Sequence, residues 1–71
     1  MSTVDPILAS ALARAGRAEL ESRLALARQH RAEADEQHGR WSREHELARL
    51  RVRQIANEFA ERGLPLPARV Q

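Results

Sequence analysis

Two of the three histidines have neighbours at spacings that are familiar from metal sites. Asp35 and His38 are three residues apart, which is the carboxylate-x-x-histidine spacing of di-iron helical bundles. His38 and His45 are seven residues apart, which places them about 10.5 Å apart along a helix, whereas two ligands of one zinc ion lie within ~4 Å. The glutamates nearby do not all share the face of His38. We therefore expect no metal ion and no cofactor, with the histidines at the polar end of a helical interface.

Ser42 and His45 are neighbours on one helical turn and would be the only serine and histidine pair for hydrolysis. A hydrolase also needs an oxyanion hole and a strained nucleophile turn, and a simple helical chain offers neither. No glycine-rich phosphate loop, metal-finger spacing or dinucleotide fingerprint is present in the sequence. The sequence therefore predicts a non-enzymatic protein in which Ser42 caps a helix.

Basic residues cluster at Arg49, Arg51 and Arg53, within a segment, 47–53, that contains no acidic residue. On a helix, Arg49 and Arg53 share a side, while Arg51 points roughly 160° away from either at about 100° per residue. A dimer could still assemble a stripe of arginines for phosphates. Arg49 and Arg53 are the candidate nucleic-acid contacts of our alternative hypothesis, a small dimeric helical regulator of phage or plasmid type. The competing interpretation is a solvated arginine face.

Composition limits the protein to one small domain without covalent staples. The 71 residues include no cysteine and no tyrosine, and Trp41 and Phe59 are the only aromatic residues. A chain of this size buries only ~60% of the surface that its unfolded form exposes, so a core of its own is marginal. Natural proteins this small usually gain stability from a staple or a partner, and the absence of cysteine excludes disulfides. The net charge of +2 is weak evidence for a polyanionic partner.

No targeting or membrane segment is recognisable. The N-terminal residues have no basic region, and no apolar run approaches the ~20 residues that cross a bilayer. Glutamates interleaved with the arginines of residues 43–61 also disfavour a helix lying on a membrane surface, which has a strongly cationic polar face. We expect a cytoplasmic protein with no membrane partner and a disordered N-terminus over residues 1–4.

Helix signals cover residues 5–62. Asp5 and Pro6 form a helix start, because an aspartate side chain accepts from free N–H groups and proline has none to lose. Good helix formers continue to about residue 37, with Gly16 as one weak link of about 1 kcal/mol, where we expect at most a kink. Gly63 followed by Leu64 predicts a helix stop, and residues 63–71 should form an extended Leu/Pro tail.

The connection at residues 38–42 allows two all-α folds. In the first, Gly39 ends one helix and Ser42 caps the next, giving a two-helix antiparallel hairpin. In the second, the apolar spacing continues through Gly39, giving one long helix of about 87 Å in a coiled coil. The centre of the long helix would present Arg31, Ala34 and His38 to its partner, which is a poor coiled-coil core. We favour the hairpin.

An apolar stripe in steps of four and three follows the C-terminal half, as expected for a helix that packs lengthwise on another helix. It predicts a protein interface formed by Leu20, Leu24, Trp41, Val52, Ile55 and Phe59, with His45 and Ala48 in the same stripe. Leu47 and Leu50 lie on nearly the opposite side and form a secondary interface. Leucines of the N-terminal half also spread over more than one face. This surplus predicts that two hairpins complete a four-helix bundle, so the chain acts in assembly or regulation through homodimerisation or by docking on a larger partner.

Overall fold

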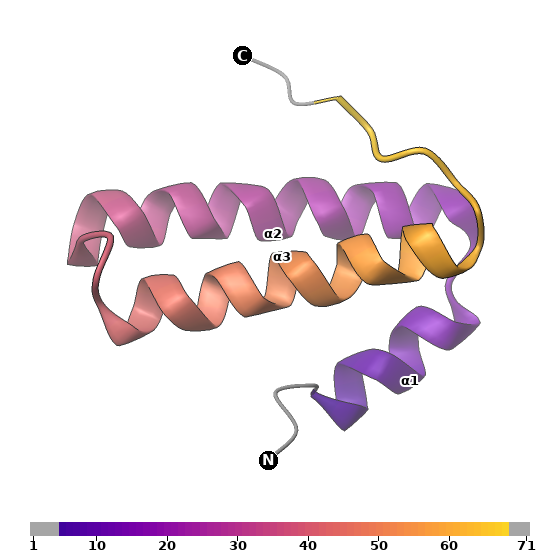
Figure 1. Cartoon of the computed structure of the whole chain (residues 1–71), viewed down its shortest axis with the longest axis horizontal. Helices are drawn as coiled ribbons and strands as arrows, with labels where there is room; N and C mark the ends of the chain where they lie inside the picture. Colours follow the sequence, from indigo (N-terminus) through magenta and orange to yellow (C-terminus); the bar gives the residue numbers. More distant parts are fainter. Residues whose placement is uncertain (1–4, 69–71) are drawn as a thin grey trace.

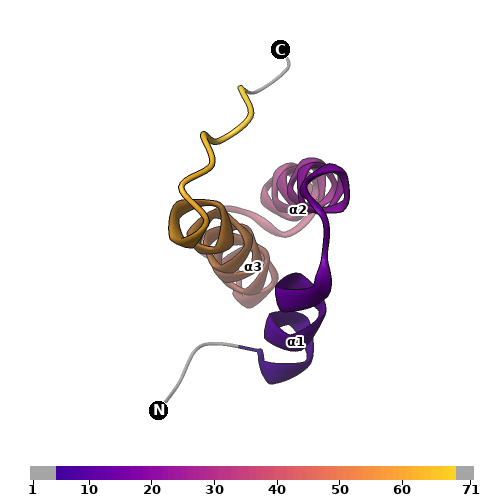
Figure 2. The same ribbon diagram turned by 90° about the vertical axis from the view of Figure 1, so that its right-hand side faces the viewer.

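The computed structural model describes residues 5–68 and consists of three helices. They are α1 (Pro6–Arg14), α2 (Arg17–His38) and α3 (Arg43–Glu61). The two long helices, α2 and α3, pack side by side and antiparallel, and the short α1 lies against the C-terminal half of α3 (Figure 1). Viewed along α3, the three helices form a triangle (Figure 2). Two predictions concern residues outside the described range: the disorder of residues 1–4 and the last part of the extended tail, residues 69–71.

The hairpin prediction is confirmed, and the single long helix is wrong. Gly39 has φ 91° and ψ 156°, a region that is essentially restricted to glycine and that ends α2. The N–H of Gly39 donates to the Asp35 carbonyl at 3.0 Å. The Ser42 hydroxyl accepts from the His45 N–H at 3.1 Å and donates to the Gly39 carbonyl at 2.7 Å. One serine side chain therefore caps α3 and ties the turn together.

The first helix starts where the sequence predicts, but it is much shorter than expected. The Asp5 carboxylate accepts from the N–H groups of Ile7 at 2.9 Å and Leu8 at 3.3 Å, and Pro6 follows the cap. Instead of a kinked helix, the chain leaves the helical conformation completely at Ala15 (φ −74°, ψ 140°) and Gly16 (φ −76°, ψ 170°). These two extended residues reverse the chain, so α1 and α2 are separate elements.

Contacts from α3 explain why the helix breaks there. Arg62 donates through its guanidinium to two carbonyls at the end of α1, those of Leu12 at 2.7 Å and Ala15 at 2.8 Å. The Leu12 carbonyl also accepts from the Ala15 N–H at 3.1 Å. At the other end of α1, the Gln54 amide accepts from the Asp5 N–H at 3.1 Å and donates to the Asp5 carbonyl at 3.0 Å. α1 is thus fixed at both ends and runs parallel to α3. Gly16 has a low helix propensity, which permits the break, and the contacts with Gln54 and Arg62 stabilise it.

The helix stop after Arg62 also forms as the sequence predicts. Gly63 is left-handed with φ 69° and donates to the Ala60 carbonyl at 3.1 Å, while the Leu64 N–H donates to the Phe59 carbonyl at 2.9 Å. This pair of bonds is the Schellman motif. Leu64 folds back onto the core. The chain then has no regular secondary structure up to residue 68, and Arg28 of α2 holds it by donating to the Pro67 carbonyl at 2.8 Å.

All three helices contribute to one small apolar core. Leu12 of α1 lies in the same buried cluster as Leu20 and Leu24 of α2, and Leu8 packs against this cluster, because the break at Gly16 turns the two helices toward one interior. Much of the leucine surplus that pointed to a second chain is therefore buried within this chain. Leu26 is the exception, since 53% of it is exposed on α2. The buried residues are Leu12, Ala15, Leu20, Leu24, Ala27, Val52, Ile55 and Phe59.

Candidate interaction surfaces

Five of the six residues predicted for the main interface meet inside the chain. Val52, Ile55 and Phe59 of α3 are 8%, 2% and 0% exposed, and they face Leu20 and Leu24 of α2, both 0% exposed. The spacing of four and three residues thus marks a real helix–helix seam, and in this conformation both sides of the seam belong to one chain. A partner that uses these residues has to displace α1 or α2.

Trp41, the sixth residue, is separated from the seam. It lies in the turn before Ser42, and 94% of it is exposed. Trp41 is in phase with the stripe only if the helix extends to it, but the Ser42 cap makes the helix begin at Arg43. Trp41 lines a surface hollow of about 450 Å³. The other residues around this hollow are Arg40, Ser42, His45, Glu46 and Arg49.

The predicted secondary interface lies on α3 away from α2. Leu47 is 56% exposed and Leu50 is half-buried. Large apolar side chains are exposed on every helix and on the tail. Within residues 5–68, five are exposed, which equals the number of large side chains that are fully buried. The exposed five are Ile7, Leu26, Trp41, Leu47 and Leu66.

The predicted nucleic-acid contacts differ in their surroundings. Arg49 is half exposed and forms an ion pair with Glu46 at 2.9 Å. Arg53 is exposed and has no hydrogen bond or ion pair to the residues that the structure describes. Exposed pairs of this kind contribute only a few tenths of a kcal/mol, so Arg49 remains accessible to an anion. Arg51 is exposed on another side of α3, as the helical periodicity predicts.

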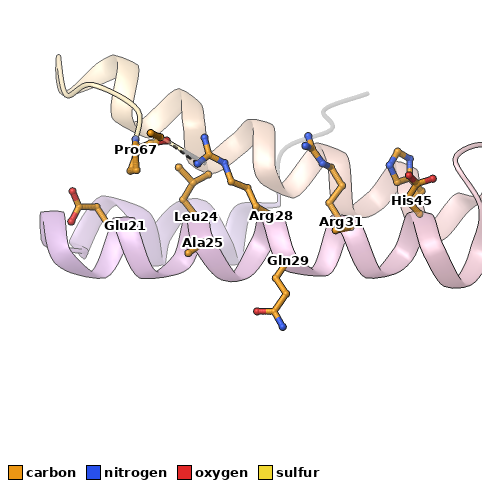
Figure 3. A pocket seen from close by; sticks show the side chains of 11 residues that line it. Glu21, Leu24, Ala25, Arg28, Gln29, Arg31, His45 and Pro67 are labelled. Atoms are coloured by element: carbon orange, nitrogen blue, oxygen red, sulfur yellow. Dashed lines mark hydrogen bonds between the residues drawn. The ribbon is translucent and has the colours of Figure 1, made fainter. Parts of the chain in front are cut away.

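A groove between α2 and the tail was not predicted from the sequence (Figure 3). It has a volume of about 710 Å³ and is lined by side chains of both charges, including Arg28, Arg31 and Asp35. Arg28 holds Pro67 on one side, and its Nε is buried with no hydrogen-bond partner in the described part of the chain. His45 of α3 closes the far end of the groove. One feature of the sequence could have indicated this groove: Arg28 follows Leu24 by one helical turn and therefore lies beside the seam. There it faces the tail that returns along α2.

The contacts that hold α1 were also missed. Glu58 and Arg62 form an ion pair across one helical turn at 2.8 Å. Arg62 is only 28% exposed at its side chain, however, and it also binds two carbonyls of α1. Gln54 binds the backbone of Asp5 across 49 residues of sequence. No local pattern identifies such partners, because each depends on how the two helices meet.

The histidines do not form a metal centre in this conformation. His38 is exposed at the end of α2, whereas His45 is half-buried and lines the groove with Asp35. Among residues 5–68, no three histidine, aspartate or glutamate side chains are grouped so that they could hold a metal ion.

In the same range, no helix is long and apolar enough to cross a membrane. In comparisons with known proteins, the chain matches no protein-family model, no curated protein and no solved structure.

Proposed function

We propose that this chain is a non-enzymatic helical interaction protein that acts in assembly or regulation, with Trp41 as the centre of its contact surface. One observation carries the proposal: the largest apolar side chain of the protein is 94% exposed at a well-ordered turn. Tryptophan dominates small interfaces because a single side chain buries a large area. Two hydrogen bonds of Ser42 hold the backbone of the turn, so little backbone entropy is lost when Trp41 is covered.

The preferred partner is a second copy of the chain, which would give a bundle of helices from two hairpins. The alternative partner within the same proposal is a larger complex on which the chain docks. Leu47 and Leu50 supply further apolar surface on α3. Phe59, Ile55 and Val52 do not take part in this contact, since they are buried in the core. The proposal therefore places partner contacts at the turn end, while the seam stabilises the hairpin.

Trp41 provides its own reporter because it is the only tryptophan. We expect its fluorescence to shift from that of a solvated indole to shorter wavelength as the concentration rises, in parallel with a dimer seen by sedimentation velocity. Trp41→Ala should weaken this association about 100-fold, as for a central interface tryptophan, and leave the thermal unfolding midpoint unchanged.

Ile7→Ala is the matched control, since Ile7 is also apolar and 82% exposed but lies on α1. It should leave the association unchanged. A dimer in which the emission of Trp41 stays that of a solvated indole would contradict a contact centred on Trp41. A monomer at every concentration would contradict self-association and leave docking on a larger partner.

Nucleic-acid binding is the second candidate, and the hollow beside Trp41 is the observation that favours it. Arg40 and Arg49 line this hollow together with the indole, and Arg53 follows Arg49 one turn later on α3. A base stacked on an aromatic ring with arginines at the phosphates is the usual arrangement for single strands. The acidic side chain in the same hollow, Glu46, opposes it.

Reversing charge at Arg49 and Arg53 separates the two candidates. If the chain binds nucleic acid, Arg49→Glu with Arg53→Glu should abolish binding of a fluorescent oligonucleotide in an anisotropy titration. The circular dichroism spectrum should not change, because both side chains are exposed. Binding by the unsubstituted protein should also fall steeply with salt, in proportion to the phosphates neutralised. Binding that persists unchanged at high salt would exclude this candidate.

A further inference from the structure

α1 is attached to the rest of the chain through α3. Four hydrogen bonds hold it. The Gln54 amide accepts from the Asp5 N–H and donates to the Asp5 carbonyl, and the Arg62 guanidinium donates to the carbonyls of Leu12 and Ala15. Its apolar contribution is Leu12, which is buried, and Leu8, which is partly buried. These contacts use backbone groups and one apolar edge of α1, and none of them requires α1 to come from the same chain.

The link between α1 and α2 is a short hinge with no steric requirement for its bend. Ala15 and Gly16 have ordinary extended torsion angles, and a Cβ built on Gly16 meets no atom within 4 Å. The residues on both sides are strong helix formers, mainly alanine, leucine, arginine and glutamate. The same residues can therefore form one continuous helix from Pro6 to His38, which is the helix that the sequence alone predicts.

Arg62 opposes that continuous helix directly. In an unbroken helix, the Leu12 carbonyl would accept from the N–H of residue 16 and the Ala15 carbonyl from the N–H of residue 19. In the structure, the Arg62 guanidinium donates to the same two carbonyls at 2.7 and 2.8 Å. The two arrangements satisfy the same groups, so the exchange between them leaves no buried carbonyl unpaired.

Straightening the hinge removes α1 from α3 and takes Leu8 and Leu12 out of the shared core. We propose that the α1 of a second copy then occupies this site, giving a dimer in which the two chains exchange their first helices. The second copy is the fitting occupant because its α1 carries the same Leu8 and Leu12 edge and the same Asp5 backbone groups for Gln54. Such exchange preserves the two Gln54 bonds and the apolar packing of α1, replaces the two Arg62 bonds with helical bonds, and needs only a change at the hinge.

This inference rests on the proposed function, because both require the chain to associate with a second copy. The helix exchange and the contact at Trp41 use different residues. Exchange depends on Gly16, Arg62 and the α1 edge, while the surface of Trp41 stays exposed in either arrangement. A Trp41→Ala variant should therefore still exchange helices. If exchange fails, the contact at Trp41 is unaffected, so the two proposals are tested independently.

Two substitutions of Gly16 test this proposal, and both are compatible with the backbone conformation of the folded monomer. Gly16→Ala has room for its methyl group and favours the continuous helix by roughly a factor of five per chain, so the dimer should tighten about 25-fold. Gly16→Pro fits the observed φ of −76° and the extended Ala15 before it, but it cannot lie inside a helix. That variant should lose the exchanged dimer. Sedimentation equilibrium over a range of concentrations measures both.

Cross-linking identifies the route of association. The chain has no cysteine, so Asp5→Cys with Asn57→Cys introduces one pair, on α1 and one turn after Gln54 on α3. A short bis-maleimide should join the two cysteines within one chain in the Gly16→Pro variant. In the Gly16→Ala variant it should join two chains, and denaturing electrophoresis distinguishes the products. Equal association of the two Gly16 variants, or a dimer of Gly16→Ala that cross-links only within chains, would overturn the exchange.

Discussion

Phe59→Ala should unfold most of the protein at 25 °C. Phe59 is 0% exposed and belongs to the buried cluster to which all three helices contribute and against which Leu64 packs. Truncation of a buried phenylalanine costs about 3–5 kcal/mol. The total stability expected for a domain of this length is about 4–11 kcal/mol, and the small core places this chain toward the lower end. The far-ultraviolet circular dichroism signal and a urea titration measure the loss of helix.

Phe59→Leu is the matched control, because leucine retains most of the apolar volume and should leave a folded protein with a lower urea midpoint. Trp41→Ala, which removes a larger aromatic ring from a site that is 94% exposed, should leave the midpoint unchanged. The contrast tests whether the seam or the turn supports the fold. A Phe59→Ala protein with the normal urea midpoint would mean that the core described here is wrong.

Gly39→Ala should be the most damaging substitution outside the core. The residue has φ 91° and ψ 156°, and L-residues held in such regions cost about 1–3 kcal/mol. A cost of about 2 kcal/mol corresponds to a fall of roughly 8–16 °C in the unfolding midpoint of a domain this small. The cause is the backbone alone, since a Cβ at this position meets nothing within 4 Å. Differential scanning calorimetry measures the shift.

A D-alanine at position 39 isolates that cause, and a chain of this length is accessible to chemical synthesis. D-residues favour positive φ, so this protein should be at least as stable as the one with glycine. If the L- and D-alanine proteins unfold at the same temperature, the backbone of Gly39 does not define the turn. The hairpin would then depend on the Ser42 cap and the seam.

The sequence predicts the ends of the helices best, because their chemistry is local. The Asp5 cap, the Ser42 cap and the left-handed Gly63 each depend on residues within a few positions. For the same reason the choice between hairpin and long helix could be made, since Gly39 and Ser42 are both typical of a break. Only the position of Trp41 was misjudged there, because periodicity continues in phase across a turn that the cap interrupts.

The break at Gly16 could not be predicted in the same way. Its torsion angles are open to any residue, and glycine inside a helix is a modest penalty. What decides the conformation is the arrival of Arg62 and Gln54 from nearly fifty residues away. The same distance explains why the leucines of the first half looked like surface for a partner. Once α1 turns back, most of them belong to one interior.

The separation in sequence between α1 and its binding site also determines when this site exists during synthesis. Gln54 is made 49 residues after Asp5, a delay of about 2–10 s at ~5–20 residues per second. Until Gln54 and Arg62 have been made, the leucine edge of α1 has no docking site within its own chain. α1 is therefore made first among the three helices but is the last to gain its binding site.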